Sequence, residues 1–221
     1  KNIFSILDFG EYGFKGVKIE TIGLILNGRK INDNKVKFYS YANKKYLLQN
    51  QDYIIDSKFP YWLLYRNKFF DQVCKKMEFG VFNFFRDRQI TKKHTLNKGK
   101  IRVLKSRNIS NNNIVSLDGY DTYLNQIDSF AVSKYLNKKN VYLVPNLTYY
   151  PRACKLPENS IVDGSAALIF PKNNQIINNE QIEFFASDEF TNFYRIARNF
   201  GTRSLNIDRN SIFFWGLKKT G

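Results

Sequence analysis

The sequence predicts a mixed α/β (α+β) fold in which a short group of strands precedes a predominantly β domain with packing helices. Short β-branched and aromatic runs alternate with Asn, Gly and Pro clusters along most of the 221 residues. Two segments, 61–76 and 188–199, instead repeat apolar residues at the three- and four-residue spacing of a helix. Hydrophobic residues make up 43% of the chain and aromatic residues 16%, which is enough apolar material to form a packed core.

The first 58 residues predict a small strand group with a connector. Residues 3–9 and 17–26 are apolar, β-branched runs joined by a glycine-rich turn, so they predict two neighbouring strands. An Asn-Gly turn signal follows, and 36–41 alternates as a third strand would. The polar stretch 44–56 predicts a connector and a short helix.

Residues 59–221 predict a second, mostly β domain. Pro60 is placed to begin a helix over 61–76, and a helix over 188–199 has a continuous apolar stripe. Helical pieces are expected within 119–138. The expected strands are 79–85, 101–105, 113–117, 141–144, 160–163 and 165–170.

Composition excludes several classes of protein. No apolar run approaches the roughly 20 residues that span a bilayer, and no basic-then-apolar signal opens the sequence. We therefore expect a cytoplasmic protein with no membrane partner, in which Cys74 and Cys154 are reduced, buried thiols. The single His94 and two distant cysteines cannot supply four zinc ligands, so no metal site is expected.

The chain is strongly basic, with 35 Lys and Arg against 19 Asp and Glu and a formal net charge of +16. Such a charge fits an acidic polymer, nucleic acid above all, although a basic surface can also serve solubility alone. Nucleic acid is favoured because the arginines occur beside aromatic and amide residues, which stack on bases and contact base edges. The candidate DNA-binding residues are Phe84, Phe85, Arg86, Arg88, Lys105, Arg107, Asn108, Tyr149, Tyr150, Arg152, Arg198, Thr202 and Arg203.

Several motifs resemble those of gamma-class adenine-N6 DNA methyltransferases of type II restriction-modification systems. The string ILDFGEYGFKGVKIETIGLIL at 6–26 resembles the late strands of their catalytic domain. The sequence from Phe59 onward is similar to their C-terminal target-recognition domain, the TaqI-type specificity domain. The supporting motifs lie at 79–91, 101–110, 144–153 and 193–207. The resemblance implies that 1–58 is a remnant of catalytic-domain strands and that 59–221 recognises double-stranded DNA.

Two motifs of that family do not occur in this sequence. They are the Gly-rich loop that binds S-adenosylmethionine and the Asn-Pro-Pro-Tyr loop that holds the target amino group; by the family pattern both lie upstream of Lys1. The sequence begins within a strand-like run, and Met77 is its only methionine, so we expect the C-terminal part of a longer protein. The resemblance then implies no catalytic residue and no cofactor site in this chain. S-adenosylmethionine would be bound by the parent enzyme, and the partners would be double-stranded DNA and the upstream catalytic domain.

Some candidate residues have a structural interpretation beside the functional one. The resemblance implies that an aromatic residue near 84 stacks on an extruded base, and Phe85 is preferred over Phe84 because it abuts Arg86. Alternating phenylalanines on a strand are equally typical of a core. Arg107 and Asn108 predict base contacts in the major groove, or else a surface ion pair and a turn cap.

The remaining candidates lie in two further segments. Tyr149 and Tyr150 belong to a Pro-flanked loop and are either DNA contacts or one core and one surface residue. Gly201 predicts a helix C-cap, with Arg198 and Arg203 as phosphate clamps or as cations that favour the helix dipole.

Two other functions stay open at this point. A metal-dependent DNA endonuclease would use Asp33 and the pair Asp56-x-Lys58, a pattern that a lysine-rich chain also matches by chance. A stand-alone, non-enzymatic specificity subunit predicts the same DNA binding as the methyltransferase reading. Only sequence upstream of Lys1 separates those last two.

Overall fold

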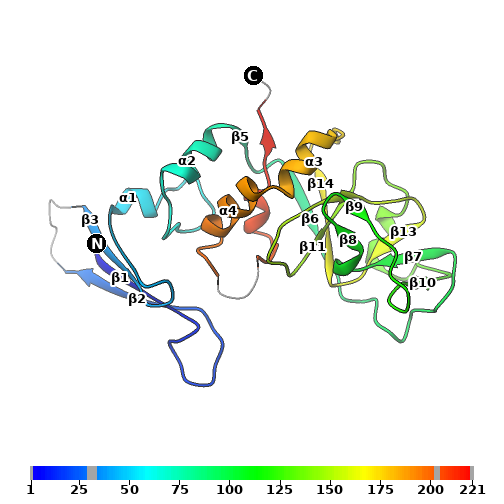
Figure 1. Cartoon of the computed structure of the whole chain (residues 1–221), viewed down its shortest axis with the longest axis horizontal. Coiled ribbons are helices and arrows are strands. Elements are labelled where there is room, and N and C mark those ends of the chain that lie inside the picture. The colour runs from blue at the N-terminus through cyan, green and yellow to red at the C-terminus, as the bar shows by residue number, and fades with distance from the viewer. Residues whose placement is uncertain (1, 29–33, 202–204, 220–221) are drawn as a thin grey trace. The chain divides into compact units, whose positions relative to one another are not determined.

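The computed structural model describes residues 2–28, 34–201 and 205–219, and Figure 1 labels most of its helices and strands. Short strands in several small sheets predominate, together with four α-helices among the described residues, which confirms the mixed class. The chain divides into two compact units: Lys1–Gln72 with Arg195–Arg203, and Val73–Tyr194 with Ser204–Gly221. Residues 59–72, which the sequence groups with the second domain, therefore cluster with the first unit.

The first unit is built on a four-stranded sheet with the order β2-β1-β3-β4. β1 pairs antiparallel with β2 and parallel with β3, and β3 pairs antiparallel with β4. Its core side chains include Ile6, Val36 and Phe38, all fully buried. The strands are β1 (Asn2–Gly10), β2 (Thr21–Asn27), β3 (Lys35–Ser40) and β4 (Lys45–Asn50).

Apolar side chains are exposed along β2, which is an edge strand among the described residues. Ile22 and Leu24 are each 44% exposed, Ile25 is 48% exposed and Leu26 51%. Successive side chains of a strand point to opposite faces, so Ile22, Leu24 and Leu26 lie on one face and Ile25 lies on the other, between Gly23 and Asn27. One face of β2 is therefore apolar and exposed, which is typical of a face that another element covers.

The first unit departs from the expected elements at two places. The segment 45–50, expected as a connector, is strand β4. It pairs with β3 along its whole length, although its own sequence does not alternate apolar and polar residues as a typical strand does. The helix expected over 61–76 begins only at Lys68, where α2 (Lys68–Lys75) starts after the Asn67 side chain accepts a hydrogen bond from the Phe70 N–H at 2.9 Å. The short helix expected before residue 56 is α1 (Gln51–Ile54).

The second unit contains a three-stranded sheet, β10-β7-β13, and a four-stranded antiparallel sheet, β12-β11-β14-β6. Two short pairs, β8 with β9 and β5 with β15, complete it. The strands are β5 (Met77–Glu78), β6 (Phe82–Phe85), β7 (Ile101–Leu104), β8 (Ile109–Ser110), β9 (Asn113–Ile114), β10 (Thr122–Leu124), β11 (Tyr142–Pro145), β12 (Cys154–Lys155), β13 (Ser160–Val162), β14 (Ala166–Pro171) and β15 (Leu217–Lys218).

Both sheets of the second unit contribute to one hydrophobic core, in which Val103, Leu143, Ile161 and Leu168 are fully buried. Because short strands from both sheets share this core, the loops that follow them start from fixed points. The helical segments of this part of the chain are η1 (Ser106–Asn108), η2 (Ala131–Tyr135), α3 (Asn179–Phe185), α4 (Asp188–Ala197) and η3 (Ser211–Phe214).

Aromatic packing anchors the helical part of the second unit. The stripe predicted for the helix at 188–199 is confirmed, because α4 buries Phe190, Phe193 and Tyr194 completely. The rings of Phe190 and Tyr194 stack at 5.8 Å between centroids, and the Trp215 ring meets Phe190 edge-on at 5.1 Å. No helix in the described part of the chain has the length and apolar character of a membrane span.

The two cysteines have different environments. Both are free thiols, but only Cys154 is buried, and the prediction that Cys74 is buried is wrong because that side chain is half-exposed on α2. Burial raises the pKa of the Cys154 thiol to about 12, with Arg152 acting in the opposite direction. At neutral pH the Cys154 sulfur therefore stays protonated.

Candidate nucleic-acid interface

Four loops of the second unit meet at one end of its two sheets. β6 and β11 both pair antiparallel with β14, so both end where β14 begins. β7 and β13 run parallel and end side by side, with Leu104 opposite Val162. β13 leads directly into β14. We call the loops that follow β6, β7, β11 and β13 the loop cluster; they are residues 86–88, 105–109, 146–152 and 163–165.

The loop 163–165 contacts each of the other three loops through hydrogen bonds. Arg86 Nε donates to the Gly164 carbonyl at 3.0 Å. The Ser106 N–H donates to Ser165 Oγ at 3.1 Å, and the Asn146 N–H donates to the Ser165 carbonyl at 3.0 Å. Segments separated by up to 79 positions in the chain are thus joined at this end of the sheets, from Arg86 to Ser165.

The two arginines after β6 have different environments. Arg86 is half-buried, and burial, together with the charge of Arg88, lowers its pKa. Its Nη2 donates at 2.9 Å to the Asn146 side-chain oxygen, in the amide orientation whose nitrogen donates to the Ile207 carbonyl at 3.3 Å. Arg88 is exposed. Arg86 therefore packs the loops together, whereas Arg88 faces solvent.

Asn108 is fully buried, and its amide is used within the protein. Its oxygen accepts from the Lys105 N–H at 3.0 Å. Its nitrogen donates to the Val115 carbonyl at 3.1 Å and to Asp121 Oδ1 at 2.6 Å. Of the two interpretations of this residue, the geometry favours the turn cap.

Arg107 is exposed and lies over the ring of Tyr120, at 5.1 Å from guanidinium carbon to ring centroid. Lys105 Nζ lies 4.6 Å from the same centroid and donates to the Tyr120 carbonyl at 2.8 Å. Tyr120 thus sets the position of two candidate cations. Sequence reasoning missed it, because its only signal is spatial: it lies in a turn well away from both cations in the chain.

The two phenylalanines of β6 are engaged in packing to different extents. The Phe85 ring lies 4.7 Å from that of Tyr135 and is packed against the hydrophobic core of the second unit. Lys134 Nζ lies 5.0 Å from the Phe85 centroid. Phe84, on the opposite face of the strand, is half-buried.

Arg152 lies between the loops after β7 and β11. Its Nε donates to the Ile109 carbonyl at 2.7 Å and its Nη2 to the Ser106 carbonyl at 3.3 Å. Its Nη1 donates to Thr148 Oγ1 at 2.9 Å and to the Tyr150 carbonyl at 3.0 Å. Burial lowers the pKa of this guanidinium.

The side chains at the tip of the same loop point to solvent. Leu147 is 59% exposed, Tyr149 65% and Tyr150 62%. A contiguous group of exposed apolar and aromatic side chains can mark an interaction site. The sequence allows Tyr149 and Tyr150 to be either DNA contacts or one core residue and one surface residue. The second interpretation does not fit this geometry, because both rings are exposed.

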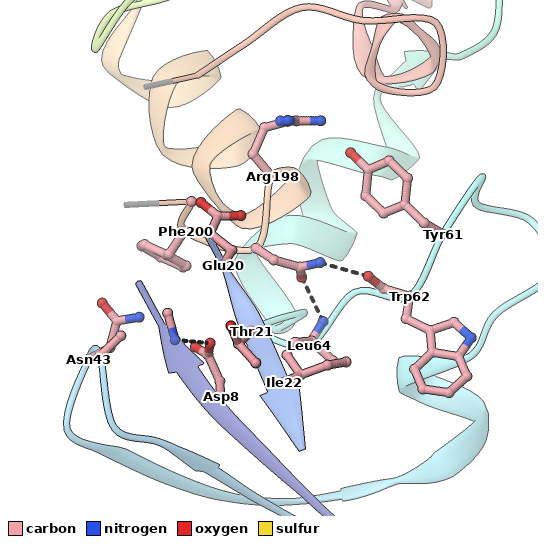
Figure 2. A pocket seen from close by; sticks show the side chains of 14 residues that line it. Asp8, Glu20, Thr21, Ile22, Asn43, Tyr61, Trp62, Leu64, Arg198 and Phe200 are labelled. Atoms are coloured by element: carbon pink, nitrogen blue, oxygen red, sulfur yellow. Dashed lines mark hydrogen bonds between the residues drawn. The ribbon is translucent and has the colours of Figure 1, made fainter. Parts of the chain in front are cut away.

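The last predicted segment belongs to the first unit, and Thr202 and Arg203 lie outside the described residues. Arg198 lines a pocket of about 580 Å³ together with Asp8, Glu20, Tyr61 and Phe200 (Figure 2). This volume is within the range of small-molecule sites. Of the two arginines predicted to clamp a phosphate, Arg198 and Arg203, only Arg198 is among the described residues, and it lines this pocket.

The chain after α4 turns in a way that the sequence did not predict. The left-handed residues are Asn199, with φ 51°, and Phe200, with φ 53°, so Gly201 is not the C-cap. The Asn199 side chain accepts from the Leu64 N–H and donates to the Trp62 carbonyl, both at 2.8 Å (Figure 2). These two bonds satisfy backbone groups in a segment that is expected to be helical and that instead precedes α2.

A buried carboxylate lies at the floor of the same pocket. Asp8 accepts hydrogen bonds from the Gly10 N–H at 2.9 Å, from the Ser40 hydroxyl at 3.0 Å and from the Tyr65 hydroxyl. Burial, and then the bond to Asp8, raise the pKa of Tyr65 to about 12. Both carboxylate oxygens of Asp8 therefore accept hydrogen bonds from within the fold.

The residues of the endonuclease alternative are only partly described. Asp33 lies outside the described residues. Asp56 accepts from the Lys58 N–H at 3.0 Å, which lowers its pKa, and pairs with Arg66 at 2.8 Å. Among the described residues, no three His, Cys, Asp or Glu side chains gather as a metal site.

The loop cluster offers exposed cations next to exposed aromatic rings, and the pocket of the first unit offers carboxylates next to aromatic rings. The first combination suits a polyanion with planar bases. A scan against protein-family models gives no match for this chain, and a search of curated proteins gives none either.

Proposed function

We propose that the second unit recognises a specific sequence in double-stranded DNA, as the C-terminal part of a bacterial, cytoplasmic adenine-N6 DNA methyltransferase of a restriction-modification system. The observation that carries the proposal is the convergence of three motifs, at 86–88, 105–108 and 149–152, in one loop cluster. Loops held on a rigid scaffold are where proteins commonly place recognition residues.

The chemistry of the loop cluster supports DNA as the partner. Arg88 and Arg107 are exposed and present guanidinium groups, which bind phosphates or the O6 and N7 edge of guanine. Tyr149 and Tyr150 add exposed rings with polar tips. The net charge of +16 supplies a long-range attraction to the DNA backbone.

The first unit supports the presence of a further domain in the functional protein. One face of β2 exposes Ile22, Leu24 and Leu26, and an element of an adjoining domain that packed on this face would cover them. In the proposal this domain is the methyltransferase catalytic domain, which binds S-adenosylmethionine. A specificity subunit that acts on a separate catalytic chain would use the same loop cluster.

The proposal is tested with the full chain and a fluorescein-labelled, mixed-sequence DNA duplex. Fluorescence anisotropy between 50 and 300 mM NaCl is expected to give an affinity that falls steeply with salt, at about −0.9 in the log–log slope for each phosphate contacted. Selection from a random duplex pool is then expected to enrich one sequence. An affinity that does not change with salt would contradict DNA binding, and salt-dependent binding without any enriched sequence would contradict specific recognition.

A further inference from the structure

Arg152 differs from the other cations of the loop cluster because its hydrogen-bonding capacity is nearly used within the protein. A guanidinium has five N–H donors. Four of them reach Ile109, Thr148, Tyr150 and Ser106 at 2.7 to 3.3 Å. Among the residues that the structure describes, the fifth N–H, on Nη2, has no acceptor. Such a group is poorly placed to bind a phosphate, which needs two parallel N–H groups for a strong contact.

The acceptors of Arg152 belong to two different loops. Ser106 and Ile109 follow β7, on either side of Arg107, whereas Thr148 and Tyr150 follow β11. Thr148 reinforces the second loop, because its hydroxyl accepts from the Tyr150 N–H at 3.1 Å and donates to the Tyr150 carbonyl at 2.7 Å. The backbone of 148–150 is therefore held from the inside, and its exposed side chains are presented on the outside.

We propose that Leu147, Tyr149 and Tyr150 form a preorganised surface that contacts base edges of duplex DNA, and that Arg152 positions this surface relative to Arg107 without touching the DNA. The inference rests on the proposed DNA recognition. An apolar side chain beside two phenols fits the thymine methyl group and the polar edges displayed in the major groove. Fixing the loop before binding lowers the entropy that is lost when the contact forms.

Two substitutions of Arg152 separate a positioning role from a phosphate contact. Arg152→Lys keeps the positive charge but cannot reach four acceptors in a planar fork, and Arg152→Gln removes the charge. For a positioning residue, both variants lose about tenfold in the ratio of affinities for the selected and the mixed-sequence duplex, the value of one base contact. Both also keep the salt slope of the wild type.

A phosphate contact predicts a different pattern, which would overturn the proposal. Arg152→Lys would then resemble the wild type, and Arg152→Gln would lose about 0.9 from the slope with its sequence preference retained. Arg209→Gln is the matched control, because Arg209 is exposed and lies outside the loop cluster. Tyr149→Ala and Tyr150→Ala are expected to lower the preference for the selected duplex, and an unchanged preference in both would exclude the surface.

Hydrogen exchange tests the positioning role without any DNA. In Arg152→Lys and Arg152→Gln the amides of 106–109 and 147–150 are expected to exchange faster, while those of β11 and β14 keep their protection. Unchanged exchange in both loops would overturn the role. If β14 also loses protection, the Arg152 variants have disturbed the whole fold, and a milder pair of variants is needed. Thr148→Val removes the hydroxyl that accepts from Arg152, and Thr148→Ser, which keeps it, is the control. Thr148→Val is expected to lower the sequence preference as Arg152→Lys does, and equal behaviour of the two Thr148 variants would refute the proposal.

The two proposals fail in different ways. A wild-type chain that binds no DNA or selects no sequence contradicts the proposed function, whatever the exchange measurements give. A wild-type chain that selects a sequence, and keeps that preference in Arg152→Lys, contradicts only the inference about Arg152.

Discussion

Tyr65 is a hydrogen-bond donor to Asp8, the buried carboxylate of the first unit. Its hydroxyl donates to Asp8, and its ring packs 5.0 Å from the ring of Phe38. We expect Tyr65→Phe to keep the ring contact and to lower the free energy of unfolding by about 1–3 kcal/mol, since Asp8 loses a donor in a buried site. Urea denaturation at pH 7 measures this, and Tyr12→Phe, at an exposed position, is the control.

The same substitution should change the dependence of stability on pH. The pKa of Tyr65 is raised to about 12 in the folded state, whereas an unfolded tyrosine ionises near 10. The hydroxyl therefore contributes stability below about pH 10, and this contribution is lost as the pH rises through the folded pKa. Between pH 9.5 and 11 the wild type should lose stability more steeply than Tyr65→Phe. Equal slopes would contradict the pKa assignment.

Arg107 and Asn108 are neighbours for which we expect opposite effects. Asn108→Ala should lower the free energy of unfolding by about 1–3 kcal/mol, because it leaves the Lys105 N–H and the Asp121 carboxylate without their buried partner. Arg107→Ala should leave stability within about 0.5 kcal/mol and cost about 1–3 kcal/mol in binding to the selected duplex. Thermal melts measure the stability of both variants, and competition binding measures their affinity for the selected duplex. Uniform weakening on all duplexes by Arg107→Ala would make that residue a phosphate contact instead.

Sequence reasoning could name Asn108 but could not decide its role. An amide after a strand fits a base contact and a turn cap equally well, and the deciding partners, Val115 and Asp121, come from a later turn. Tyr120 illustrates the same limit, since nothing in its own segment marks it as the support of Lys105 and Arg107.

Among the elements, the turn from β13 to β14 has little room for a larger residue at Gly164. A Cβ added at Gly164 would lie 2.8 Å from Arg88 Cγ and 2.9 Å from the Asp87 carbonyl oxygen. We expect Gly164→Ala to cost about 1–3 kcal/mol of stability and to loosen the loop after β6, because the carbonyl belongs to the backbone and cannot move alone. Calorimetry and hydrogen exchange of residues 86–88 measure this. Gly28→Ala, with nothing within 4 Å of its added Cβ, should be neutral.

Elements with a strong pattern of their own were predicted from sequence, and elements made by distant partners were not. The apolar stripe of α4 and the runs of β1, β11 and β14 carry their own signal. β4 depends on pairing with β3, and the late start of α2 coincides with the bonds that Asn199 makes to Trp62 and Leu64. A side chain 135 positions away along the chain leaves no trace in the local periodicity.

For the molecule as a whole, the charge of +16 has two effects that salt should separate. Like charges on a folded chain repel one another, and NaCl screens this repulsion. We therefore expect Tm to rise between 20 and 300 mM NaCl, over the same range in which DNA affinity falls. The Arg102–Asp121 pair, with side chains 21% and 13% exposed, should be little affected by this screening. A Tm that falls with NaCl would mean that attractive pairs outweigh the net repulsion.

The division of the whole chain illustrates what linear reasoning cannot supply. The family resemblance implies a boundary near residue 58, but a single boundary in the sequence assumes that each unit is continuous. The first unit also takes in Arg195–Arg203, whose Asn199 bonds the backbone near Trp62. Discontinuous units of this kind follow from tertiary contacts, which no local composition reveals.

The apolar edge of β2 also bears on how this polypeptide behaves when it is produced by itself. The outer edge of β2 has no partner strand among the residues that the structure describes, and with Ile22, Leu24 and Ile25 beside it this edge can act as a template on which a second molecule adds its own β2. Two four-stranded sheets would then fuse across one seam, and further growth would compete with correct folding. A lysine in place of Ile25 would act as a gatekeeper against such growth. Light scattering during concentration would show the difference, because the natural protein is expected to aggregate at a lower protein concentration than Ile25→Lys.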